Sequence, residues 1–196
     1  MMRKLYFFKT HFYLTIILAF ICLLSLGGCS KYSDEVQVNL TKLQKTKACP
    51  GCDLSGIELI SFDLKGADLS GANLTGANLK RSDLSGANLT DTNLTDADLL
   101  GVTLSGATLT NTNLTGVKLS YSNINGADIY GAVLKDAHMN SSKVVNSKIR
   151  NSDMTGANLY NADLTGTKVS KKTLKDAVLC KTVMPSGQQD DSGCKR

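Results

Sequence analysis

The segment ADLSGANLTGANLKRSDLSGANLTDTNLTDADLL, residues 67–100, repeats a five-residue unit without interruption. Each unit has an aliphatic residue at its centre. A small residue stands two positions before the centre, and Asp or Asn often stands directly before it. The spacing extends from Leu54 to Leu179 and gives 26 centres, none of them polar. A period this short and this regular indicates a repeat architecture in which each unit packs against its neighbours.

The period itself narrows the backbone conformation. An amphipathic helix repeats every 3.6 residues and a half-buried strand every two, so neither explains a period of five. A chain that turns a corner once in every unit does explain it. The centre and the residue two positions earlier then point inward, as alternate residues of one strand do. At that earlier position 12 Ala, 5 Ser and 3 Thr occur, and such small residues let opposite walls approach closely. Gly, Asn, Asp and Ser supply the turns.

Units such as ADLSG (67–71) and ANLTD (87–91) resemble those of the pentapeptide-repeat proteins. The resemblance implies an all-β fold, a right-handed quadrilateral β-helix with four units in each coil. We expect this domain to span residues 52–181. At about 4.8 Å between stacked strands, the 26 units make a rod roughly 30 Å long.

Both ends of the rod need a cover, because an open solenoid exposes core and strand edges. Residues 29–51 are predicted to form a tether and a short N-terminal helical cap, since Val36, Leu40 and Leu43 have helical spacing. Residues 182–196 resemble a C-terminal extension found in some proteins of the family.

The first 28 residues resemble the signal peptide of a bacterial lipoprotein. A basic start precedes an apolar run at 12–26, which is short for a membrane span but suits a signal-peptide core. The run ends in LGGC (26–29), which resembles a lipobox. The resemblance implies that the signal is removed and that Cys29 receives a diacylglyceryl group and an acyl chain such as palmitate, which together anchor the exported protein to a membrane. Ordinary secretion and an uncleaved anchor are the alternatives.

This prediction places the protein in the bacterial cell envelope. Ser30 follows the modified cysteine, where Asp commonly signals retention in the inner membrane. The outer membrane is therefore favoured if the organism has one.

Four cysteines remain after lipidation and removal of the signal: Cys49, Cys52, Cys180 and Cys194. The two pairs lie at opposite ends of the expected rod, and a disulfide needs Cα atoms within about 7 Å. Only the pairings 49–52 and 180–194 are therefore possible. A redox C-x-x-C motif and a zinc site are the alternatives for the first pair. No thioredoxin-like pattern surrounds that pair, and the distant pair cannot complete four zinc ligands.

The sequence contains no recognisable catalytic, cofactor-binding or metal-binding motif, so we predict a protein that is not an enzyme. His138 is the only histidine beyond the signal, and the repeat itself accounts for the abundant Asp and Ser. Residues 53–116 have 3 basic and 8 acidic side chains, whereas residues 117–179 have 9 and 5. A basic distal end of this kind can attract an anionic envelope polymer or an acidic protein.

The outward positions of one predicted face carry apolar side chains, which can mark a partner site. The function predicted on these grounds is a lipid-anchored scaffold or protein-interaction module of the envelope, with an unidentified partner and an open oligomeric state. A DNA-mimicking topoisomerase binder is an alternative, but it needs an acidic surface and a cytoplasmic location. An envelope enzyme without a recognisable motif is another. No nucleic-acid partner is expected, because the net charge after residue 29 is only slightly positive. The residues of the predicted partner surface are Ile60, Leu100, Tyr121 and Tyr160.

Overall fold

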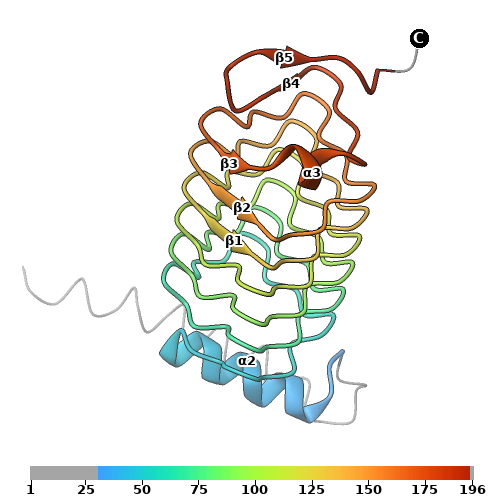
Figure 1. The fold of residues 1–196 in the computed structure, drawn as a ribbon. Coiled ribbons are helices and arrows are strands. Elements are labelled where there is room, and N and C mark those ends of the chain that lie inside the picture. Colours follow the sequence, from blue (N-terminus) through green and yellow to red (C-terminus); the bar gives the residue numbers. More distant parts are fainter. Residues whose placement is uncertain (1–30, 195–196) are drawn as a thin grey trace, which may run out of the picture. The chain divides into compact units, whose positions relative to one another are not determined.

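The computed structural model describes residues 31–194. The predictions for the signal peptide and for lipidation at Cys29 lie outside the described residues. From residue 34 onward the chain forms one compact unit, a stack of four-sided coils with a helix at one end and a hairpin at the other (Figure 1). Its elements are α2 (Asp34–Thr46), β1 (Asp128–Tyr130), β2 (Lys148–Arg150), β3 (Lys168–Val169), α3 (Lys171–Leu174), β4 (Thr182–Val183) and β5 (Gln189–Asp190).

The coils are held together by parallel bridges between residues twenty positions apart. The first pairs Ala48 with Asp68, and the last pairs Asp163 with Val183. Four units therefore make one coil, and the ladder extends slightly beyond residues 52–181 at both ends. On one face the bridges lengthen into a parallel sheet of β1, β2 and β3. There Ile129, Ile149 and Val169 lie in register.

The interior of the stack is filled by the aliphatic centres. Of the 26 centres, 24 are buried, and the exceptions are Val169 and Leu179 near the C-terminal end. Where Ser or Thr takes the small inward position, its hydroxyl bonds to a backbone carbonyl, in most cases one of the preceding coil and for Ser122 and Ser142 one of the same coil. Thr112 Oγ1 donates to the Leu89 carbonyl at 2.7 Å, for example. These hydrogen bonds offset the desolvation that a buried hydroxyl would otherwise suffer.

Most corners are β-turns that begin at a centre. The Ala67 N–H donates to the Leu64 carbonyl at 3.0 Å, and Gly66 between them has φ +64°. A positive φ at the third residue alone defines a type II turn, which favours Gly or Asn there. This explains why Gly recurs two positions after the centres, with Asn111 and others adopting the same conformation.

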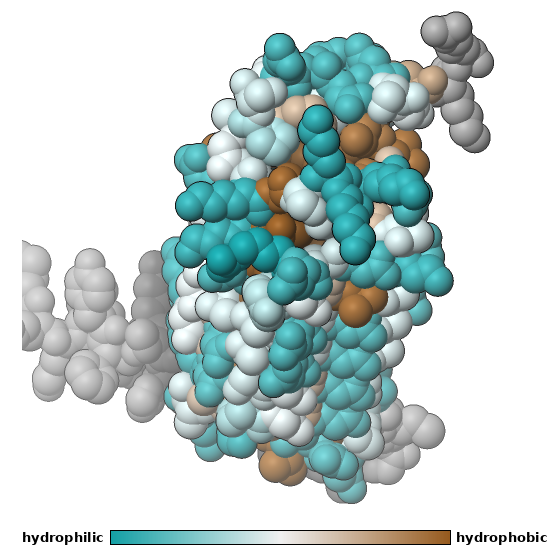
Figure 2. Space-filling view, in the orientation of Figure 1, coloured by the Kyte–Doolittle hydropathy of each residue, from teal (hydrophilic) through white to brown (hydrophobic). Residues whose placement is uncertain are grey.

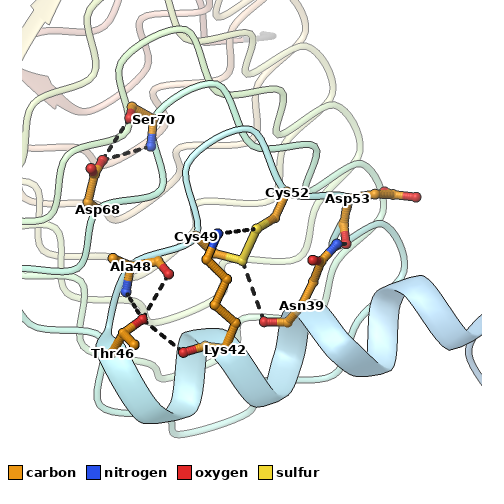
Figure 3. Close-up of a disulfide and its surroundings, with 9 residues drawn as sticks. All are labelled: Asn39, Lys42, Thr46, Ala48, Cys49, Cys52, Asp53, Asp68 and Ser70. Carbon is orange, nitrogen blue, oxygen red and sulfur yellow. Dashed lines mark hydrogen bonds between the residues drawn. A yellow bond between two sulfur atoms is a disulfide. The ribbon is translucent and has the colours of Figure 1, made fainter.

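Helix α2 covers the N-terminal coil with its apolar side. Val36 and Leu43 are buried, and the Asn39 side-chain amide donates to the Asp53 carbonyl at 3.0 Å. Beneath the helix, Cys49 and Cys52 are joined by a disulfide with a Cα separation of 5.4 Å. Figure 3 shows that Asn39 and Lys42 extend from α2 toward this disulfide. The helix is therefore attached to the first coil through both apolar and polar contacts.

The C-terminal end is covered by a hairpin. Strands β4 and β5 pair antiparallel, and a disulfide joins Cys180 to Cys194 with a Cα separation of 4.7 Å. The Gly193 N–H donates to the Leu179 carbonyl at 2.8 Å. A Cβ on Gly193 would lie 2.7 Å from the Leu179 nitrogen, so this close approach requires glycine.

Candidate functional site

The residues predicted as a partner surface share one face of the stack but do not form a continuous patch. Bridges along this face connect Glu58 through successive coils to Val178. The four side chains are exposed by 36–68%. Polar residues, including Lys80 and Asn140, occupy intervening coils in the same column. Isolated exposed hydrophobic residues are ordinary on protein surfaces, so a partner surface on this face stays a prediction. Its members are Ile60, Leu100, Tyr121 and Tyr160.

Most of the acidic side chains of the repeat are engaged within their own units. Asp68 Oδ1 accepts from the Ser70 hydroxyl at 2.7 Å and from the Ser70 N–H at 3.1 Å. These hydrogen bonds favour the ionised form and lower the pKa of Asp68. The Thr155 hydroxyl and N–H lower the pKa of Asp153 in the same way. Such carboxylates act as turn-forming groups. Among residues 31–194, no group of three or more His, Cys, Asp or Glu is placed to hold a metal ion.

The regular ladder is interrupted on the face that follows β2. In the preceding coil, the Gly131 N–H donates to the Arg150 carbonyl and the Leu134 N–H to the Asp153 carbonyl, at 2.9 and 2.7 Å. The equivalent donors one coil later are the N–H groups of Asn151 and Met154. Neither has a hydrogen-bond acceptor within the described part of the chain. The carbonyl of Ser152 likewise has no donor among those residues.

The cause is the short helix α3, which takes the place of the next strand. Ser170 is its N-cap, and its hydroxyl accepts the Thr173 N–H at 3.1 Å. The Ser170 carbonyl accepts the Leu174 N–H at 3.4 Å. Two of the groups that would have paired with residues 151–154, the Ser170 carbonyl and the Thr173 N–H, are thus used inside α3. The ladder resumes when the Gly156 N–H donates to the Asp176 carbonyl.

A groove of about 1040 Å³ lies between α3 and the unpaired edge at residues 151–154. Half-buried Val169 contributes apolar surface to it, above the buried side chains of Ile149 and Met154. Figure 2, in the orientation of Figure 1, shows hydrophobic surface at the level of β3 and α3, flanked by long hydrophilic side chains. Other lining residues include Tyr130, Ser152, Ser170 and Thr173.

The rim of the groove is basic. Arg150, Lys168, Lys172 and Lys175 line it, against the two carboxylates of Asp153 and Asp176. Arg150 Nη2 lies 3.7 Å from Asp128 Oδ1. No ion pair joins the three lysines to any carboxylate within residues 31–194, whereas Lys65 and Lys80 near the other end pair with acids at 3.2 and 3.0 Å. The groove therefore presents uncompensated positive charge beside free backbone donors.

Sequence reasoning identified one sign of this groove without recognising the groove itself. Lys172 occupies an inward position where small residues are usual, and an unpaired ammonium would be costly in the core. We therefore expect the coil to open there and Lys172 to reach solvent. In the structure Lys172 is exposed on α3, as expected.

The stacked four-sided coils and their filled interior define a repeat solenoid. A family model for pentapeptide repeats matches the sequence in eight copies, so the chain belongs to the pentapeptide-repeat family, whose members fold as right-handed quadrilateral β-helices. A comparison with curated proteins found no match. The family matches cover residues 52–91, 63–99, 97–136, 118–156 and 132–170.

Solved structures of the family are also similar to this chain. HetL, a pentapeptide-repeat protein involved in heterocyst differentiation regulation in Nostoc sp. strain PCC 7120, is 21% identical over 82% of this chain and 100% of its own, with a TM-score of 0.35. The Nostoc protein alr5209 is 30% identical over 50% and 79%, with a TM-score of 0.45. QnrB1, a plasmid-mediated fluoroquinolone resistance protein, is 19% identical over 71% and 80%, with a TM-score of 0.41.

Proposed function

We propose that this protein is a lipid-anchored, non-catalytic interaction module of the bacterial cell envelope. The proposal rests on where the side chains of the repeat lie and which hydrogen bonds they form. The aliphatic centres fill the interior, and many Asp and Asn side chains bond within their own turns. What the described solenoid offers to other molecules is its outer surface, and in particular the groove beside α3.

The anchor part of the proposal rests on the motif at residues 26–29 and on the charge and length of the segment before it. No helix within residues 31–194 is long and apolar enough to cross a membrane. Two acyl chains are enough for stable attachment to a bilayer. The two disulfides agree with an oxidising location outside the cytoplasm.

Metabolic labelling with an alkyne analogue of palmitate tests the anchor. Wild-type protein is expected to incorporate the label and to sediment with membranes. The Cys29→Ala variant is expected to lose both properties. Cys22→Ala, in the preceding segment, is the matched control and should keep both. Label retained in Cys29→Ala, or unlabelled wild-type protein in the soluble fraction, would contradict lipidation at this residue.

Crosslinking in intact cells tests the interaction part. We expect discrete crosslinked species for the wild-type protein, and we expect them to change when the groove rim is altered by Lys168→Glu and Lys172→Glu. A turnover assay with broad envelope substrates should remain negative. Turnover that survives purification would overturn the non-catalytic assignment.

A further inference from the structure

The unpaired edge in the groove has the hydrogen-bonding pattern of a strand that lacks its neighbour. In the coil before it, Asp153 donates its N–H to the Ala132 carbonyl at 3.0 Å and accepts the Leu134 N–H at 2.7 Å. One residue of each coil therefore forms hydrogen bonds with both a carbonyl and an N–H group of the coil before it. One coil later, the Ser152 carbonyl and the Met154 N–H are the equivalent pair, and no residue within 31–194 bonds to either.

We propose that the groove binds an extended, acidic segment of a partner protein, which adds to the interrupted coil as the missing strand. This proposal rests on the interaction-module part of the proposed function and does not depend on the lipid anchor. One residue of the segment lies opposite Asp153, donates to the Ser152 carbonyl and accepts from Met154. Peptides that extend an open sheet edge gain affinity from such main-chain bonds and specificity from alternate side chains.

The surroundings of the edge define the chemistry of the segment. Side chains alternate between the two faces of a strand, so the residues on either side of the paired residue lie over Ser152 and Met154, close to half-buried Val169, and should be small or apolar. The residues two positions before and two positions after the paired residue face the basic rim, where Lys168, Lys172 and Lys175 favour carboxylates. The residue opposite Asp153 should be uncharged, because a like charge directly across a pair is destabilising. The sequence Glu-Val-Thr-Val-Glu meets all three conditions.

An acidic peptide fits the groove better than a simple anion does. Phosphate or a lipid headgroup would accept hydrogen bonds from the N–H groups of Asn151 and Met154, and its hydroxyl can donate to the Ser152 carbonyl, but it does not supply the N–H and C=O of one residue at strand spacing. The groove, with a volume of about 1040 Å³, also has apolar surface that a small anion would leave uncovered. A polypeptide in extended conformation uses the donors, the acceptor and the apolar surface together.

Binding of fluorescein-labelled Glu-Val-Thr-Val-Glu to the full-length protein in detergent micelles, followed by fluorescence anisotropy, tests the proposal. We expect saturable binding that weakens by about tenfold or more in a Lys168→Glu/Lys172→Glu variant. The matched control is Lys118→Glu/Lys143→Glu, which reverses two exposed charges on other faces of the same half and should change affinity only slightly. Equal weakening in both variants would indicate general charge attraction and would overturn the proposal.

The strand geometry is tested separately from the charge. A peptide with N-methylated threonine keeps its carboxylates but cannot donate to the Ser152 carbonyl, so we expect it to bind about tenfold more weakly. Hydrogen exchange of the Met154 amide should slow when the unmodified peptide is bound. Equal affinity of the methylated peptide, or displacement of the peptide by inorganic phosphate or phosphatidylglycerol vesicles at matched ionic strength, would show an anion site instead. Loss of peptide binding with palmitate labelling intact would refute this inference alone.

Discussion

The faces at residues 129–136 and 149–156 have the same place in successive coils but different neighbours. The first is covered by the next coil, and the N–H groups of Gly131 and Leu134 are both bonded. The second faces α3, and the equivalent N–H groups of Asn151 and Met154 have no acceptor within residues 31–194. A face of this solenoid is thus completed by the unit twenty residues later. A local departure from the pattern there opens the wall without unfolding the coils below.

The largest difference in stability is expected when a charge is placed inside the regular stack or beside the groove. We expect Leu114→Asp, in the regular stack, to abolish folded protein, because burying an unpaired carboxylate costs several kcal/mol and whole domains are stable by only about 5–15 kcal/mol. Val169→Asp, at a half-buried centre beside the groove, should fold with a reduced melting temperature. Circular dichroism during heating measures both. If the Leu114 variant melted like the wild type, Leu114 would not point inward.

The two disulfides provide the next largest effect. Cys180–Cys194 closes a loop of about 15 residues and should contribute roughly 3 kcal/mol through the entropy of the unfolded chain. Cys49–Cys52 closes a much shorter loop and should contribute about 2 kcal/mol. Chemical denaturation of the paired Ser variants measures each value. A larger loss for the 49–52 variant would show that this bond mainly holds α2 on the first coil.

Repair of the interrupted unit should close the groove. Lys171→Gly with Lys172→Ala restores the turn glycine and the small inward residue that other units have. We expect the chain to pair with residues 151–154 and to satisfy the N–H groups of Asn151 and Met154 and the Ser152 carbonyl, for a net gain of about 2 kcal/mol of stability after the hydrogen bonds of α3 are lost. Slower hydrogen exchange at the Met154 amide would report the new ladder. Lys118→Ala serves as a control for loss of charge, and an unchanged Met154 amide in the repaired chain would mean that another feature opens the coil.

The smallest expected effect is a dependence of stability on pH. The Ser70 and Ser85 hydroxyls and N–H groups lower the pKa values of Asp68 and Asp83 below 3.8. The stability that these carboxylates contribute is fully present above 3.8 and is lost as pH falls through their folded-state pKa values. We expect a modest drop in melting temperature between about pH 5 and about pH 2.5. Asp68→Asn/Asp83→Asn keeps the acceptor oxygens and should show a shallower drop; an unchanged slope would assign the acid sensitivity to other groups.

The sequence alone predicts most of the fold, because one residue in five is both buried and aliphatic. That period predicts the inward position of Leu114. It also predicts the small residues two positions before the centres and the turn glycines two positions after them. The groove does not follow, because it depends on how the polar groups of Ser170 and Thr173 bond to each other rather than to the coil below. Lys172 indicated that a wall opens at this point. Hydrophobic periodicity does not encode which backbone groups an opened wall leaves unpaired.

The twenty-residue register also constrains how the length of this protein can change. Gain or loss of one full coil would move the groove by about 4.8 Å along the stack and keep it on the same side. Gain or loss of a single unit would instead rotate everything after it by a quarter turn. The distance between the two ends can therefore vary in evolution in steps of four units while the direction in which the groove faces is preserved.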